Sequence, residues 1–213
     1  MTTAQKLVLT VLSIAVVVVF GVLAYLLLSG AAQGSGAIAE LPRPTPTPTI
    51  VYTLEGITFT AKSGYAAAET LALAWQPDAQ PASVSADWRP ATVEALAQPV
   101  AWSYQFYSPK ARRIYVVVVQ DGEAQAIHEQ LVPYPVDTFA PEEWRVDSTE
   151  VLTIWLNRGG GWFLARYPAA SVFAHLGVVG DDRRWVWRVT GVAERGNRTH
   201  TVLVDPVTGA VVR

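Results

Sequence analysis

The feature that most restricts this chain is an uncharged apolar run of 22 residues, from Leu7 to Leu28. At about 1.5 Å per helical residue the run is roughly 33 Å long, and the hydrocarbon layer of a bilayer is about 30 Å thick. The run therefore predicts a transmembrane helix at residues 7–28 that contacts membrane lipid. A cleaved signal peptide is the alternative, because small residues follow the run, but its apolar region usually spans only about 7–15 residues.

Charges around this run set the expected topology. Lys6 precedes it, and the segment SGAAQGSGA that follows carries no charge. The bias of basic residues toward the cytoplasmic side predicts a cytoplasmic tail at residues 1–6 and an extracytoplasmic C-terminal part, held at the cell membrane by one helix. After residue 28 there are 15 basic and 18 acidic residues. A slightly acidic domain is a poor nucleic-acid binder, so no nucleic-acid partner is expected.

Residues 29–49 have the composition of a spacer. Glycine, alanine and serine come first, and prolines at every second position follow, at Pro42, Pro44, Pro46 and Pro48. Proline fixes φ near −65° and lacks a backbone donor, so the segment is expected to be an extended polyproline stalk. The chain contains no cysteine, which excludes disulfides, thiol nucleophiles and cysteine metal sites.

Hydrophobic periodicity and turn residues predict the elements of the remaining chain. A helix is expected at residues 61–76, and a second one from Asp147, whose carboxylate can cap it, to the glycines at 159–161. The segment IYVVVVQ at 114–120 is rich in β-branched residues, which is typical of a strand buried on both faces. The expected strands lie at residues 57–60, 82–86, 102–108, 114–120, 162–168, 171–179, 185–191 and in the closing segment 199–213.

Aromatic residues fall into two groups. Those that alternate with polar residues on predicted strands are expected in the core: Trp102, Tyr104, Trp185 and Trp187. Three other tryptophans have less regular surroundings and are the candidates for contact with a partner: Trp88, Trp144 and Trp162.

Segments before and after residue 132 resemble each other. Residues AETLALAW at 68–75 match TEVLTIWL at 149–156, and the aromatic strand at 102–106 matches that at 185–189. A unit of about 60–70 residues has a marginal core by itself, so two units are expected to pack together. The sequence predicts an α+β fold of two tandem units, residues 50–132 and 133–213, each a helix packed on a small antiparallel sheet.

The closing segment carries a family resemblance. The runs WVWRV at 185–189 and TVLVDPVTGAVV at 201–212, together with WRVDSTEVL at 144–152, resemble the PepSY domain. The likeness is good over 144–213 and weaker over 57–130, where QDGEAQAI takes the place of the closing hairpin. It implies a small α+β domain outside the cytoplasmic membrane, of a kind thought in some proteins to inhibit metalloproteases. It also implies that Asp205, Thr208 and Gly209 form a structural turn, and it supplies no catalytic residue.

Residues that could carry catalysis form no recognisable pattern. His128, His175 and His200 belong to no HExxH pair, no GxSxG elbow is present, and no GK[ST] follows the glycines at 159–161. No catalytic, metal or cofactor site is therefore expected. The sequence favours a non-catalytic binding or regulatory module for a protein or peptide partner, such as a module that restrains a protease or an accessory subunit of an envelope complex.

Two alternatives remain open from the sequence. An exported hydrolase would need a histidine within reach of a carboxylate and a serine. A sensor of small ligands would need a dry cavity lined by tryptophan.

Overall fold

The computed structural model describes residues 50–98, 100–180, 183–193 and 197–212. The predicted tail, transmembrane helix and stalk at residues 1–49 lie outside the described residues. The described part of the chain contains no helix long and apolar enough to cross a bilayer.

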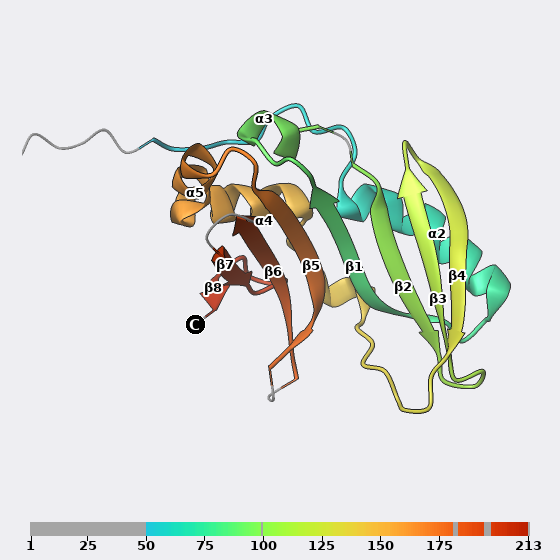
Figure 1. The fold of residues 1–213 in the computed structure, drawn as a ribbon. Helices are drawn as coiled ribbons and strands as arrows, with labels where there is room; N and C mark the ends of the chain where they lie inside the picture. Colours follow the sequence, from blue (N-terminus) through green and yellow to red (C-terminus); the bar gives the residue numbers. More distant parts are fainter. Residues whose placement is uncertain (1–49, 99, 181–182, 194–196, 213) are drawn as a thin grey trace, which may run out of the picture. The chain divides into compact units, whose positions relative to one another are not determined.

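Helices are few and strands dominate (Figure 1). In chain order the elements are α2 (Ala61–Trp75), β1 (Gln80–Trp88), α3 (Val93–Leu96), β2 (Trp102–Ser108), β3 (Arg113–Gln120), β4 (Glu123–Leu131), η1 (Pro141–Glu143), α4 (Ser148–Trp155), η2 (Leu156–Gly160), α5 (Gly161–Arg166), β5 (Ser171–Val179), β6 (Arg184–Ala193), β7 (Arg198–Val204) and β8 (Val211–Val212).

All eight strands form one antiparallel sheet in the order β4-β3-β2-β1-β5-β6-β7-β8. The expectation of two tandem units, each a helix on its own small sheet, is therefore wrong. The reason is the pairing of β1 with β5, in which residues 84–88 bond to residues 172–176. This pairing removes one exposed edge from each half of the chain, because backbone groups that would otherwise face water bond to each other.

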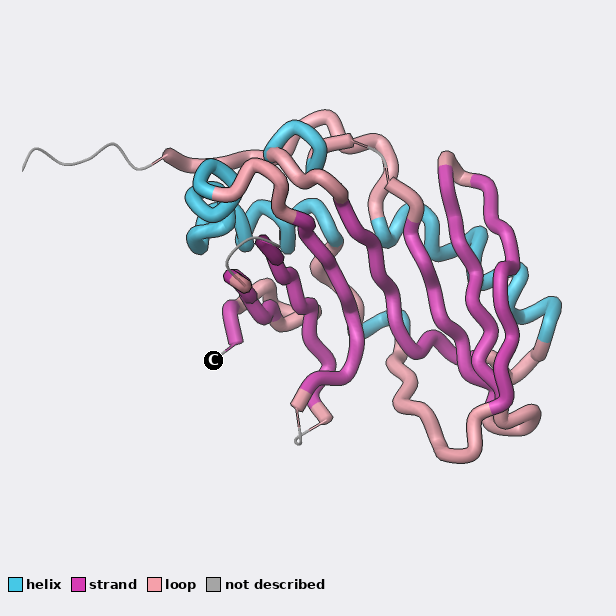
Figure 2. Tube along the Cα trace, in the orientation of Figure 1, coloured by secondary structure: helices cyan, strands magenta, loops and turns pink. Residues whose placement is uncertain are grey.

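Helices α2 and α4 lie on the same face of the sheet (Figure 2). Small residues line the buried side of α2, at Ala61, Gly64, Ala68 and Ala72, so the helix approaches the strands closely. A Cβ at Gly64 would lie 2.5 Å from the hydroxyl oxygen of Tyr104. That hydroxyl donates a hydrogen bond of 2.7 Å to the carbonyl of Ala61.

The core between helices and sheet is built on tryptophans. Trp102 and Trp187, both about 1 % exposed or less, meet edge to face across the sheet with ring centroids 6.1 Å apart. The carbonyl oxygen of Val146 accepts a hydrogen bond from the indole of Trp187 at 3.0 Å and one from Trp144 at 2.9 Å. Buried indoles therefore join the segment before α4 to the centre of the sheet.

Three predicted elements differ from the structure. Residues 57–60 form no strand and instead lead to Thr60, the N-cap of α2. The expected strand at 162–168 is mostly helix α5, because the chain bends at Gly159 (φ +110°) and then continues as helix; a short apolar run does not distinguish the two by periodicity. Strand β3 buries only Val117 and Val119, so it is covered on one face and not on both.

No helix of the described residues lies on the opposite face of the sheet (Figure 2). At one end this face is closed by the segment after β4, where Val132 packs with Ala82 and Tyr107 in a small second core. The backbone amide of Phe139 donates to the carbonyl of Pro81 at 3.0 Å and fixes this segment. The rest of the face stays open, and the candidate site lies there.

Candidate functional site

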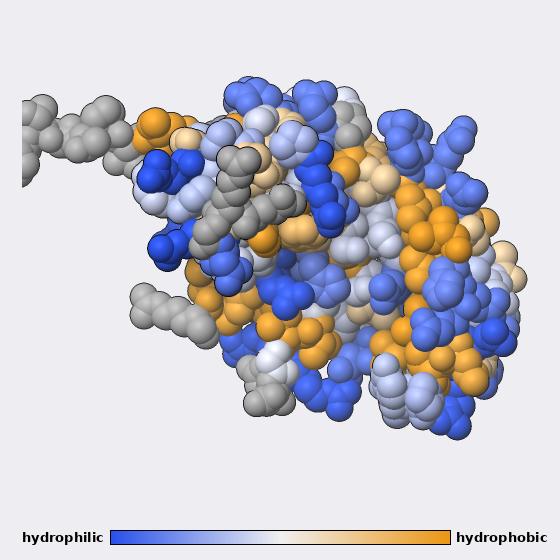
Figure 3. Space-filling view, viewed as in Figure 1, coloured by the Kyte–Doolittle hydropathy of each residue, from blue (hydrophilic) through white to orange (hydrophobic). Residues whose placement is uncertain are grey.

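The open face of the sheet contains a groove of about 950 Å³. Its lining comes from β1, β2, β3, β5, β6 and β7, the middle of the sheet. In Figure 3, which looks onto this face, hydrophilic residues occupy the centre, and hydrophobic and hydrophilic residues are mixed over β3 and β4. The groove exists because α2 and α4 cover only the other face.

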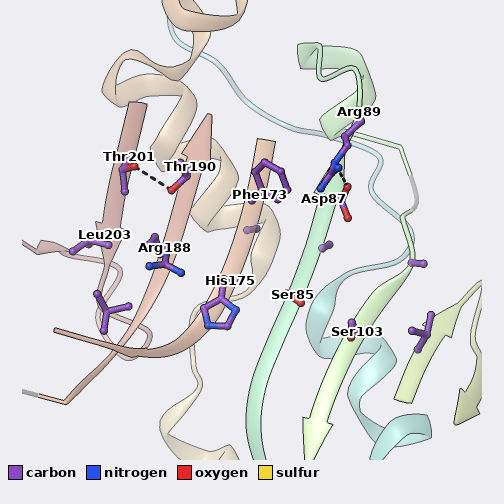
Figure 4. Close-up of a pocket in the computed structure, with 15 residues that line it drawn as sticks. Ser85, Asp87, Arg89, Ser103, Phe173, His175, Arg188, Thr190, Thr201 and Leu203 are labelled. Atoms are coloured by element: carbon purple, nitrogen blue, oxygen red, sulfur yellow. Dashed lines mark hydrogen bonds and ion pairs between the residues drawn. The ribbon is translucent and has the colours of Figure 1, made fainter. Parts of the chain in front are cut away.

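One row of side chains crosses the floor of the groove. The strand register sets Ser103 opposite Ser85, Ser85 opposite His175, and His175 opposite Arg188. Directly opposed residues in antiparallel strands have Cβ atoms about 4.5–5.5 Å apart. Figure 4 shows these four side chains on the same side of the sheet. The row combines two hydroxyls, an imidazole and a guanidinium.

Apolar side chains end the row. Val118 is opposite Ser103 on β3, and Leu203 is opposite Arg188 on β7. Both line the groove and are partly buried. The groove therefore offers a polar centre between two aliphatic ends.

The imidazole of His175 lies along its own strand over Gly177. A Cβ at Gly177 would be 2.4 Å from the Nε2 atom of His175, so the space is available because residue 177 is glycine. Burial, and to a smaller extent the positive charge of Arg188, lower the pKa of His175 below its usual value. The imidazole is therefore neutral at pH 7.

A second row forms the rim of the groove. The Nε atom of Arg89 lies 2.7 Å from a carboxylate oxygen of Asp87, and its guanidinium lies 4.7 Å from the centre of the Phe173 ring. The hydroxyls of Thr190 and Thr201 hydrogen-bond at 3.1 Å (Figure 4). The carboxylate of Asp87 is thus already paired with the guanidinium of Arg89.

This arrangement does not resemble a nucleophilic triad. Ser85 and His175 are neighbours, but no hydrogen bond joins them, and the carboxylate of Asp87 contacts Arg89 instead of His175. In the described residues no carboxylate orients the imidazole, as a triad requires. The geometry suits the binding of a ligand through hydrogen bonds and charge.

The other histidines lie apart from the groove. His128 is exposed on β4. His200 packs between Trp155 and Phe163 on the helix-covered face, with ring centroids 5.8 and 6.1 Å away. No group of three potential metal ligands occurs in the described part of the chain.

The tryptophans expected to contact a partner are not brought together. Trp88 and Trp144 are only 6 % and 3 % exposed, which corrects the expectation for them: their rings belong to the core and offer almost no surface. Trp162 is 69 % exposed on α5, outside the groove lining. Of the expected core aromatics, Trp102, Tyr104 and Trp187 are buried and Trp185 is partly buried. 

A smaller hollow of about 210 Å³ lies beside this core. Phe139, Trp144 and Trp185 line it, and the rings of Phe139 and Trp185 touch with centroids 4.7 Å apart. Ligand pockets usually measure about 300–1,000 Å³, so this hollow is small for a ligand site. The groove falls within that range.

Asp205, Thr208 and Gly209 form the turn between β7 and β8. One oxygen of Asp205 accepts hydrogen bonds from the Thr208 amide at 2.9 Å and the Thr208 hydroxyl at 3.0 Å, and Gly209 has φ +73°. The bond from the Thr208 amide is the main cause that lowers the pKa of Asp205. These residues lie outside the groove lining.

Sequence reasoning did not identify the groove residues. Ser85, Ser103, His175 and Arg188 are the polar positions that alternate with core residues on four predicted strands, so each was visible singly as an outward-facing residue. Only the pairing of β1 with β5 places them in one row. That pairing joins segments almost 90 residues apart and leaves no local signal.

Comparisons with known proteins give little further information. No family model matches the chain, and no curated protein matches it. A crystal structure from Clostridium difficile, described as "a putative lipoprotein", is similar with a TM-score of 0.43 and 10 % sequence identity, over 70 % of this chain and 90 % of that chain. A similarity at this level identifies neither a family nor a function. The PepSY resemblance and the extracytoplasmic location therefore stay predictions from the sequence.

Proposed function

We propose that this chain is a non-catalytic binding module that holds an extended peptide segment of a partner protein in the groove on the open face of its sheet. The observation that carries the proposal is the groove itself: about 950 Å³ of space over a row of hydrogen-bonding side chains on rigid strands. Sites built on strands hold their side chains in fixed positions, which favours recognition.

The dimensions of the groove support a peptide. The row from Ser103 on β2 to Leu203 on β7 spans four strand intervals of about 4.8 Å, which is roughly 19 Å. An extended chain rises about 3.3 Å per residue, so roughly six residues would cover that length. The polar centre of the row would receive the polar side chains and backbone of such a segment, and the aliphatic ends would receive its apolar side chains.

Strand addition at an edge of the sheet is less well supported. The β4 edge has an irregular register near Val116 and carries charged residues such as Glu129, two features that natural sheets use to discourage further pairing. The other edge, β8, is only two residues long. The open face is therefore the better candidate for the docking surface.

A hydrolase is the competing proposal, and the surroundings of His175 argue against it. The charged neighbour of the imidazole is Arg188, which disfavours the imidazolium that a general base must become. A binding role needs no such proton transfer.

Selection from a displayed library of random hexapeptides on the immobilised full-length chain tests the proposal. Enriched sequences should bind the wild type, and Ser85→Trp should abolish binding because the indole fills the centre of the groove. Thr70→Trp, on the exposed side of α2, is the matched control and should leave binding unchanged. Failure to enrich any peptide, or equal binding to the Ser85→Trp variant, would contradict the proposal.

A further inference from the structure

The centre of the groove contains hydrogen-bond donors and a positive charge without an acidic partner. Arg188 is exposed on β6, and in the described residues no carboxylate lies within ion-pair distance of its guanidinium. The nearby Asp87 is engaged by Arg89 at 2.7 Å. Among the residues that the structure describes, the floor therefore has a cation without a carboxylate partner, between hydroxyls and apolar ends.

We infer that the groove recognises a segment that bears a carboxylate, and that Arg188 is the residue that pairs with it; this inference rests on the proposed function. A guanidinium binds a carboxylate through two parallel hydrogen bonds, which fixes orientation as well as attraction. The hydroxyls of Ser85 and Ser103 continue the row on the far side of His175 and supply further donors.

The neighbours of Arg188 also restrict the ligand. Leu203 lies opposite Arg188 on β7, and Phe173 and Arg89 form the rim above the adjacent strand. An aliphatic side chain next to the carboxylate would contact Leu203. The preferred ligand is thus an acidic residue, or a chain terminus, next to an aliphatic residue.

Three hexapeptide probes distinguish the source of the carboxylate. The first is Ala-Val-Glu-Ala-Leu-Ala, acetylated and amidated; the second has glutamine in place of glutamate; the third is the glutamine peptide with a free carboxyl terminus. Binding to the full-length chain is measured by calorimetry. We expect the first or the third peptide to bind about 10- to 100-fold more tightly than the second, as a charge-assisted pair would give.

Substitutions of Arg188 test whether this residue pairs with the carboxylate. Arg188→Gln should remove the preference for the carboxylate, and Arg188→Lys, which keeps the charge but not the two-bond geometry, should retain part of it. Arg166→Gln on α5 is the control and should retain all of it. Unchanged thermal stability of the variants shows that folding is not the cause.

Three outcomes would overturn the inference, and they differ in scope. Equal binding of all three probes would show that the groove binds peptides without recognising a carboxylate. A carboxylate preference that survives Arg188→Gln would show that Arg188 is not the residue that pairs with the carboxylate. Absence of binding by every probe, together with an unsuccessful library selection, would contradict the proposed function as well.

Discussion

Gly177 provides the space in which the imidazole of His175 lies, two residues away on the same strand. A Cβ at position 177 would be 2.4 Å from Nε2 of His175. The position of the imidazole beside Ser85 and Arg188 therefore depends on a missing side chain. This contact links a single residue of β5 to the shape of the groove floor.

Gly177→Ala should change the groove more than the stability. The added methyl meets the end of a side chain that can turn away, so we expect the free energy of unfolding to change by no more than about 1 kcal/mol. The imidazole should move and its pKa should rise toward the usual histidine value as it becomes more exposed. An NMR titration of the histidine ring protons measures both effects; an unchanged His175 titration would contradict the account.

His175 should make stability depend on pH. Its pKa is lowered in the folded state, mainly by burial and then by Arg188, so below the unfolded value of about 6.5 the unfolded chain binds more protons. The free energy of unfolding should therefore be fully maintained above about pH 6.5 and fall as the pH decreases below it. Urea unfolding at pH 7.5 and pH 5.5 measures this loss.

Two histidine variants separate this effect from other acid-sensitive groups. His175→Gln should lose less stability between these pH values than the wild type. His128→Gln, on exposed β4, should lose as much as the wild type. Identical pH dependence in all three proteins would show that His175 is not the group involved.

Asp147 should stabilise the ends of two helices at once. One of its oxygens, Oδ1, accepts the amide of Ser148 at 2.6 Å, at the start of α4, and the amide of Lys62 at 3.1 Å, at the start of α2. Asp147→Ala removes the acceptor of both hydrogen bonds and should lower the free energy of unfolding by about 1–2 kcal/mol. Asp147→Asn keeps an oxygen there and should cost less than half as much in urea unfolding; equal losses would indicate that the charge, not the cap, matters.

Local patterns predicted much of the secondary structure. Alternation of Trp102 and Tyr104 with polar residues placed β2 at the residues the structure shows, and the proline after Trp75 ended α2 correctly. Asp147 was predicted to cap α4, but its bond to Lys62, 85 residues away, could not be predicted from the spacing. Strand positions and helix ends could be predicted from neighbouring residues, but contacts between distant segments could not.

The prediction of two tandem units was wrong for the same reason. Similar segments in the two halves suggested separate units, yet whether β1 and β5 pair or face solvent depends on edges that have no local signature. The candidate site depends on that pairing, because it brings Ser85 beside His175. Trp88 and Trp144 illustrate the converse: irregular spacing suggested a surface role, but long-range packing buries both rings.

The most direct measurement asks which face of the sheet a ligand covers. The chain has no cysteine, so single cysteines can be placed as reporters: Ser85→Cys in the groove and Thr70→Cys on the exposed side of α2. A library-selected peptide at saturation should slow maleimide labelling of the cysteine at 85 at least about tenfold, because the bound peptide covers that thiol in the occupied fraction of the protein. Labelling of the cysteine at 70 should be unchanged. Protection of the cysteine at 70, with undiminished labelling at 85, would contradict the claim that the open face is the binding site.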